Sequence, residues 1–155
     1  MSEVTTFEDL DVWKRGCNLT VDIHIGLAES KDFALRGQME RSSLSIPSNI
    51  AEGAERDSTP EFIKFLRYSK GSCGELRTQL YVAERIRKRL GAPPMDGSKE
   101  MIQETRDLSK MLQGLINSLN RRIESKLTSP ASRKRPAPST SSTDHNGSAA
   151  DIDGQ

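Results

Sequence analysis

The chain has 155 residues, of which 34% are hydrophobic and 29% charged, and its formal net charge is +1. This balance is typical of a globular protein, and a net charge so near zero excludes a polycation that holds nucleic acid by bulk charge alone. No apolar run approaches the roughly 18 residues that a spanning helix needs, so we expect no membrane segment.

The two cysteines, Cys17 and Cys73, fall on apolar helical positions rather than in turns. Two thiols in a chain with this much core-forming sequence are not typical of a disulfide framework, and no signal peptide pattern precedes them. We therefore expect a reducing, cytoplasmic environment.

The sequence divides into a core-forming part and a polar end. Residues 128–155 are rich in Ser, Pro, Ala, Gly and Asp, with Ile152 as the one large aliphatic residue. Such a segment cannot bury enough apolar surface to offset the entropy of ordering it. We expect a single domain over residues 1–127 and a disordered tail over residues 128–155.

The first predicted helix covers residues 7–29 and has an unusually wide apolar face. One stripe runs through Leu10, Trp13, Cys17, Val21, His24 and Ala28, and an adjoining one through Val12, Leu19, Ile23 and Leu27. A helix with one packing partner shows a narrower stripe, so two packing surfaces are expected here.

The second predicted helix, residues 33–55, contains the stretch SIPSNIAEG at positions 45–53. Pro47 has no backbone N–H, so it is expected to bend the helix and to leave the carbonyl of Ser43 without its usual donor. Nearby hydroxyl groups or water are expected to satisfy that carbonyl.

The same stretch places two polar side chains beside the apolar stripe. Asn49 and Glu52 are expected to pair with Arg41, with Arg56 or with a neighbouring protomer, because a carboxylate near the interior must be satisfied. Glu52 and Arg56 have the favourable i,i+4 order. We interpret these residues, with Pro47, as a shape-defining and interface motif that holds no ligand.

The third predicted helix has Ser58 or Thr59 as its N-cap and Pro60 at its first helical position. It ends before the sequence GAPPMDG at residues 91–97. The fourth covers residues 98–127. Both carry coiled-coil-like apolar seams, and Gly71 and Gly74 in the third are expected to let helices approach closely. Four helices without strand-like alternation predict an all-α fold, an antiparallel up-down four-helix bundle.

Catalytic and metal-binding patterns are weak. His24 is the only histidine of residues 1–127 and lies on an apolar stripe, where a satisfied interfacial histidine is the favoured interpretation. The Glu-x-x-His pattern of di-iron bundles is absent there, and two cysteines with one histidine fall short of four zinc ligands. We expect no enzyme activity, no cofactor, no metal and no small-molecule substrate.

Positive charge gathers on the third predicted helix. Residues 64–90 hold eight bases and two acids, a net charge of +6, whereas residues 1–35 hold three bases and seven acids, a net charge of −4. The candidate nucleic-acid-binding residues are Lys70, Arg77, Arg85, Arg87, Lys88 and Arg89. The alternative is a solvated helix end whose cations complement the macrodipole. Since the few aromatic residues fall mostly on core stripes, contacts to phosphate and shape are expected rather than base recognition.

Two stretches resemble a known family. LRGQMERSSLSIPSNIAEGAER at 35–56 and EFIKFLRYSKGSCGELRTQL at 61–80 are similar to the four-helix-bundle proteins called 23S ribosomal RNA intervening-sequence proteins, relatives of the accessory variability determinant of diversity-generating retroelements. The resemblance implies a homopentamer without enzymatic activity that binds RNA or DNA. In the retroelement branch it also implies contact with a reverse transcriptase.

Two functions remain open at this point. The first is an oligomeric module that binds RNA or DNA by backbone electrostatics beside a nucleic-acid enzyme such as a reverse transcriptase. The second is a protein scaffold or adaptor that touches nucleic acid only through its partner.

Overall fold

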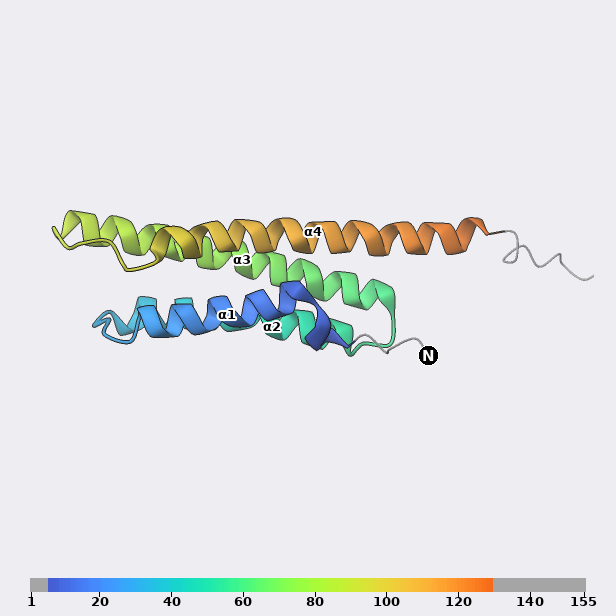
Figure 1. Ribbon diagram of the computed structural model, residues 1–155, viewed down its shortest axis with the longest axis horizontal. Helices are drawn as coiled ribbons and strands as arrows, with labels where there is room; N and C mark the ends of the chain where they lie inside the picture. Colours follow the sequence, from blue (N-terminus) through green and yellow to red (C-terminus); the bar gives the residue numbers. More distant parts are fainter. Residues whose placement is uncertain (1–5, 130–155) are drawn as a thin grey trace, which may run out of the picture.

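The computed structural model describes residues 6–129 and consists of helices joined by short loops. A 3-10 turn, η1 (Phe7–Asp9), precedes four α-helices: α1 (Asp11–Gly26), α2 (Phe33–Ala54), α3 (Thr59–Arg89) and α4 (Ser98–Thr128). Figure 1 shows the four helices lying side by side along one axis, with α4 reaching beyond the other helices at its C-terminal end.

Each helix packs against the two helices beside it around the bundle. The interfaces are α1 with α2, α2 with α3, α3 with α4, and α4 with α1, and the one between α2 and α3 is the largest. Since consecutive helices run in opposite directions, this is the predicted antiparallel up-down four-helix bundle, and the all-α fold class is confirmed.

The helix ends follow the expected local chemistry. Asp32 Oδ1 accepts a hydrogen bond of 3.0 Å from the Leu35 backbone N–H at the start of α2. Ser58 Oγ accepts one of 3.3 Å from the Glu61 N–H at the start of α3, as the sequence predicts. Gly97 has φ 72°, so it ends the α3–α4 loop in a conformation that glycine adopts without strain.

The first helix is shorter than predicted. The continuous helix expected over residues 7–29 is wrong at both ends, because η1 is separate and α1 ends at Gly26. Leu10, with ψ 121°, is extended, and the Thr6 N–H donates to Asp9 Oδ2 at 3.2 Å, which stabilises the separate turn. The apolar period continues across this break, so periodicity alone could not locate it.

The core lies along the bundle axis, with contributions from all four helices. Fully buried side chains include those of Leu19, Ile23, Met39, Ile46, Ile50, Leu66, Cys73, Leu76, Leu80, Leu108 and Leu112. The prediction for Gly71 and Gly74 is wrong within the described chain, since a Cβ at either position would meet nothing within 4 Å. The close approach is instead at Gly53, where a Cβ would lie 2.5 Å from Phe65 Cβ.

Pro47 lies within α2, which continues past it to Ala54. Pro47 has no N–H to donate to the Ser43 carbonyl. This carbonyl instead accepts a hydrogen bond of 2.9 Å from Thr20 Oγ1 on α1. The expected hydroxyl partner is therefore present, and it comes from another helix. Gly16 allows this approach, because a Cβ there would lie only 3.3 Å from Ile46 and 3.6 Å from the Pro47 ring.

The predicted domain boundary falls one residue before the end of α4, which extends to Thr128. The tail predicted to be disordered lies outside the described residues from position 130 onward.

A basic stripe between α3 and α4

Two hydrogen bonds fix how α3 and α4 lie along one another. Lys70 Nζ donates to Gln113 Oε1 at 2.6 Å, and Arg106 Nη2 donates to Tyr81 Oη at 2.6 Å. Because the helices are antiparallel, this register places Arg77 level with Lys110, and Lys88 level with Lys99 near the loop.

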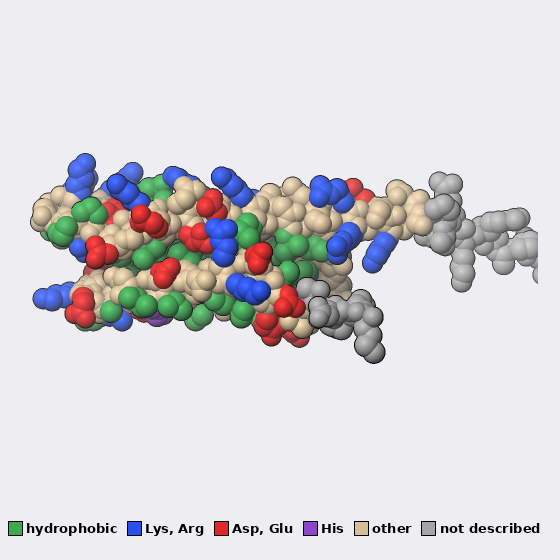
Figure 2. Space-filling model, viewed as in Figure 1, with side chains coloured by type: hydrophobic (Ala, Val, Ile, Leu, Met, Phe, Trp, Pro, Cys, Tyr) green, Lys and Arg blue, Asp and Glu red, His purple; other side chains and the backbone are tan. Residues whose placement is uncertain are grey.

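These positions form one surface, the α3–α4 basic stripe. Its members are cationic side chains of the two helices that this register places along one another: Lys70, Arg77, Arg85, Lys88, Lys99, Arg106 and Lys110. The stretch of α3 from Lys70 to Lys88 is about 27 Å long at 1.5 Å per residue. Figure 2 shows Lys and Arg side chains along the edge of the molecule formed by α3 and α4.

Like charges that lie level with one another on adjacent helices oppose the packing of the two helices. Each pair of neighbouring cations at an exposed site lowers the stability by a few tenths of a kcal/mol. Within the described residues, Arg85, Lys88 and Lys110 make no hydrogen bond or ion pair that would offset this repulsion. Within the described chain, these three cations of the stripe are therefore not held by a hydrogen bond or an ion pair.

The structure brings four of the six predicted binding residues into the stripe: Lys70, Arg77, Arg85 and Lys88. Arg89 is exposed one turn beyond Arg85, at the end of α3. Arg87 is half-buried and its Nε donates to the Pro93 carbonyl at 2.6 Å, so it holds the loop after α3. Arg87 also lines the cavity at this end of α3, so its role in binding stays a prediction.

Sequence reasoning missed the contribution of α4. Lys99, Arg106 and Lys110 are separated by seven and four residues, the spacing of one helical face, and this signal was present in the sequence. Sequence reasoning also placed the aromatic residues mostly in the core. Tyr81 is 38% exposed and lies within the stripe, and Tyr68 is exposed on another face of α3.

The opposite side of α4 is acidic. Arg15 of α1 donates to both carboxylate oxygens of Glu104 at 2.7 and 2.6 Å, and lies 3.8 Å from Asp107. The hydrogen bond with Glu104 raises the pKa of the Arg15 guanidinium. A neighbouring cleft between α1 and α4 contains Asp22 and Asp96 among its lining residues. The two sides of α4 therefore carry opposite charge.

The polar residues Asn49 and Glu52 of the SIPSNIAEG stretch bond to residues four positions away in the sequence, whereas Ser45 Oγ lies 2.8 Å from Ser72 Oγ on α3. Asn49 Nδ2 donates to the Ser45 carbonyl at 2.8 Å, and Arg56 Nη2 donates to Glu52 Oε1 at 2.7 Å. The predicted Glu52–Arg56 pair is thus confirmed. Arg41 is exposed and pairs with neither Asn49 nor Glu52.

Apolar side chains are exposed along α1 and α2. Val21 and Leu44 are each 54% exposed, Ile25 is 70% exposed and Phe33 is 75% exposed. We call these four residues the α1–α2 apolar band, and Figure 2 shows hydrophobic side chains along the edge of the molecule formed by α1. His24 adjoins the band, exposed rather than buried, with Nδ1 2.8 Å from the Thr20 carbonyl.

The remaining chemistry of residues 6–129 is limited. Cys17 and Cys73 are free thiols, and no group of three or more His, Cys, Asp or Glu residues in this range is arranged to hold a metal ion. None of the helices described combines the length and the apolar composition that crossing a bilayer requires.

The fold and the stripe define a small helical bundle with one basic and one apolar face. The family model of the 23S rRNA-intervening sequence protein matches residues 8–114, and the chain belongs to this family. A crystal structure of a protein of unknown function from the S23 ribosomal protein family of Bacteroides thetaiotaomicron is similar in fold. It has a TM-score of 0.60 and 22% identity over 68% of this chain and 97% of that one. No curated protein matches the chain.

Proposed function

We propose that the protein is a non-enzymatic, self-assembling module that binds RNA or DNA through the α3–α4 basic stripe. It would act in the cytoplasm as an accessory factor to a nucleic-acid enzyme such as a reverse transcriptase. The family name, which refers to an intervening sequence of 23S rRNA, agrees with a nucleic-acid role.

The observation that carries the proposal is the register of α3 and α4, fixed by the Lys70–Gln113 and Tyr81–Arg106 hydrogen bonds, which places Arg77 level with Lys110. A polyanion would relieve the repulsion of the stripe, and each phosphate bound would release condensed counterions. The acidic side of α4, where Glu104 and Asp107 lie, would be repelled by the same polyanion. Binding would therefore be confined to one face.

The α1–α2 apolar band supports self-assembly. Contiguous exposed apolar patches mark interaction sites in soluble proteins. A ring of identical subunits uses two different surfaces, and Val82 and Ile86 of α3 are a second pair of exposed apolar side chains. We propose the homopentamer that the family resemblance implies, in which several copies of the stripe would act together.

Charge reversal tests the binding face. Arg77→Glu should weaken binding of a labelled RNA or DNA duplex by at least tenfold at low salt, measured by fluorescence anisotropy. Lys14→Glu is the matched control, because it reverses an exposed charge on α1, away from the stripe. Equal effects of the two substitutions would show that only net charge matters and would refute the assignment of the face.

The second candidate is a protein scaffold without direct nucleic-acid contact, and the α1–α2 apolar band favours it. Pull-down of a reverse transcriptase or other partner with nuclease treatment separates the two functions. Retention of the partner after nuclease treatment supports the scaffold, whereas its release supports binding through nucleic acid.

A further inference from the structure

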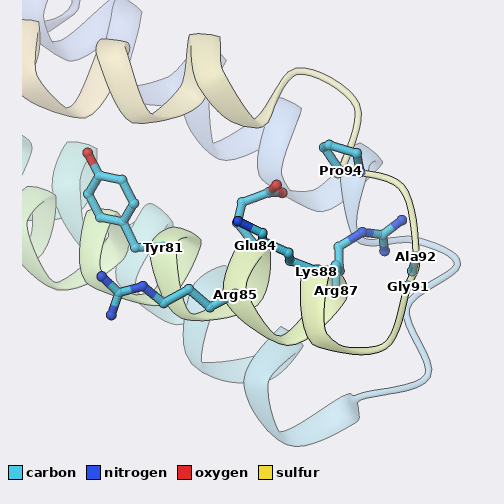
Figure 3. Close-up of a pocket in the computed structure, with 8 residues that line it drawn as sticks. All are labelled: Tyr81, Glu84, Arg85, Arg87, Lys88, Gly91, Ala92 and Pro94. Carbon is cyan, nitrogen blue, oxygen red and sulfur yellow. The ribbon is translucent and has the colours of Figure 1, made fainter.

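A cavity of about 430 Å³ lies at the loop end of the basic stripe, between the last turns of α3 and the loop that follows them. Its lining residues are Tyr81, Glu84, Arg85, Arg87, Lys88, Gly91, Ala92 and Pro94 (Figure 3). The volume lies within the range of about 300–1,000 Å³ that is usual for small-ligand sites.

Three hydrogen bonds fix the far wall of this cavity. Glu84 Oε1 accepts from the Met95 N–H at 3.0 Å, Arg87 Nε donates to the Pro93 carbonyl at 2.6 Å, and the Ala92 N–H donates to the Arg87 carbonyl at 2.9 Å. Glu84 and Arg87 thereby each hold the loop through one side-chain atom, while both residues remain part of the cavity lining. Since the described residues offer Arg85 and Lys88 no partner, these two cations are available to a ligand.

Tyr81 forms the aromatic wall. Its hydroxyl accepts from Arg106 at 2.6 Å, which ties the ring to α4, and Arg77 and Arg85 lie one helical turn away on either side. Figure 3 shows the Tyr81 ring pointing toward α4 and the Arg85 side chain extending back along α3 toward Tyr81. An aromatic face among cations is the arrangement on which unpaired bases stack in single-strand-binding proteins.

The polarity of the cavity sets the orientation of a bound nucleotide. The C-terminal end of α3 carries partial negative charge on its last carbonyl groups, so a phosphate is disfavoured near Gly91. Ala92 and Pro94 present apolar surface beside it. The phosphate therefore belongs where the Arg85 and Lys88 side chains extend back along α3, away from Gly91, and the base belongs at Tyr81 (Figure 3).

We propose that this cavity receives one unpaired nucleotide of the bound nucleic acid, with its base against Tyr81 and its phosphate at Arg85 and Lys88. This inference rests on the proposed function and narrows its substrate class to RNA or DNA that offers a single-stranded end, loop or bulge. In a blunt duplex every base is stacked within the helix, so such a ligand would engage the stripe but leave the cavity empty.

The test compares two labelled RNA probes, a blunt duplex and the same duplex with a short unpaired overhang, titrated at fixed salt with the full-length protein. Wild type should bind the overhang probe more tightly by about tenfold, the effect expected for one stacked base. Tyr81→Leu should abolish this preference, so that its affinities for the two probes become equal. Tyr81→Phe should retain it, because the ring remains. Tyr68→Leu, at an exposed tyrosine on another face of α3, should also retain it.

Circular dichroism verifies that each variant keeps its helices. Equal binding of the two probes by wild type, or an unchanged preference in Tyr81→Leu, would overturn the nucleotide site while leaving salt-dependent duplex binding in place. If wild type binds neither probe, the proposed function fails, and the cavity assignment fails with it.

Discussion

Thr20 Oγ1 on α1 lies 2.9 Å from the Ser43 carbonyl oxygen on α2, the carbonyl that Pro47 leaves without its helical donor. One hydroxyl thus compensates for a proline 27 positions away in the sequence. The same hydroxyl lies 2.9 Å from the Gly16 carbonyl of its own helix, where the missing side chain of Gly16 admits α2. Gly16, Thr20 and Pro47 therefore act together in joining α1 to α2.

Thr20→Val should destabilise the protein by about 1–3 kcal/mol, because it removes the donor of a buried carbonyl and keeps the side-chain shape. Chemical denaturation measures the change. Thr78→Val is the control, since Thr78 is exposed and bonds within its own helix. In a Pro47→Ala background the backbone N–H is restored, so the cost of Thr20→Val should shrink. An equal cost in both backgrounds would contradict the compensation.

Gly53→Ala should destabilise the bundle by about 1–3 kcal/mol, because the new Cβ would force α2 and α3 apart at Phe65. Gly37→Ala is the matched control on the same helix, where a Cβ meets nothing within 4 Å. It should be neutral or stabilising by up to about 1 kcal/mol through helix propensity. Thermal unfolding distinguishes the two, and equal effects would refute the steric explanation.

The buried Cys73 thiol links stability to alkaline pH. Burial raises its pKa to about 11, whereas a thiol in the unfolded chain titrates near about 8.5. The folded state therefore holds the proton longer, and the stability contribution present below about pH 8 is lost as pH rises towards 11. Cys73→Ser should flatten this decline in urea-unfolding curves measured across the range. If stability falls as steeply with pH in Cys73→Ser as in wild type, groups other than Cys73 cause the decline.

The α1–α2 apolar band predicts where identical copies meet. Val21→Glu together with Leu44→Glu should reduce the assembled species to monomer in light scattering coupled to gel filtration, with helicity retained, because two charges would be buried in the interface. Asn18→Glu adds the same charge to an exposed polar position of α1 and should leave assembly intact. Monomeric wild type at micromolar concentration would remove the assembly proposal.

Local signals in the sequence were sufficient to predict the four helices, because the start of α3 at Ser58 and the break at residues 91–97 are encoded by neighbouring residues. The separate turn η1 was not predictable, since the apolar period runs through Leu10 unchanged. Gly71 and Gly74 were misplaced for a related reason: membership of a seven-residue seam does not reveal which flank of the seam faces a neighbour.

The sequence analysis located the candidate site on α3 only. Its bases stand out as a run of charge, whereas Arg106 and Lys110 join them only through the register fixed by the bonds of Tyr81 and Gln113. That register is set only when α3 and α4 pack against each other, so it cannot be read from either segment alone. Tyr81 follows the buried Leu80 by one position, a rotation of about 100° that carries its ring out to the groove.

The salt dependence of nucleic-acid binding tests the central claim most directly. Affinity for a labelled duplex should fall steeply between about 50 and 200 mM salt, linearly in the logarithms, if the stripe binds several phosphates. The double variant Arg77→Glu with Lys110→Glu should lower that slope by about 1 for each phosphate that its side chains no longer neutralise. A wild-type affinity that does not respond to salt, or a slope that the double variant leaves unchanged, would contradict binding through the α3–α4 basic stripe.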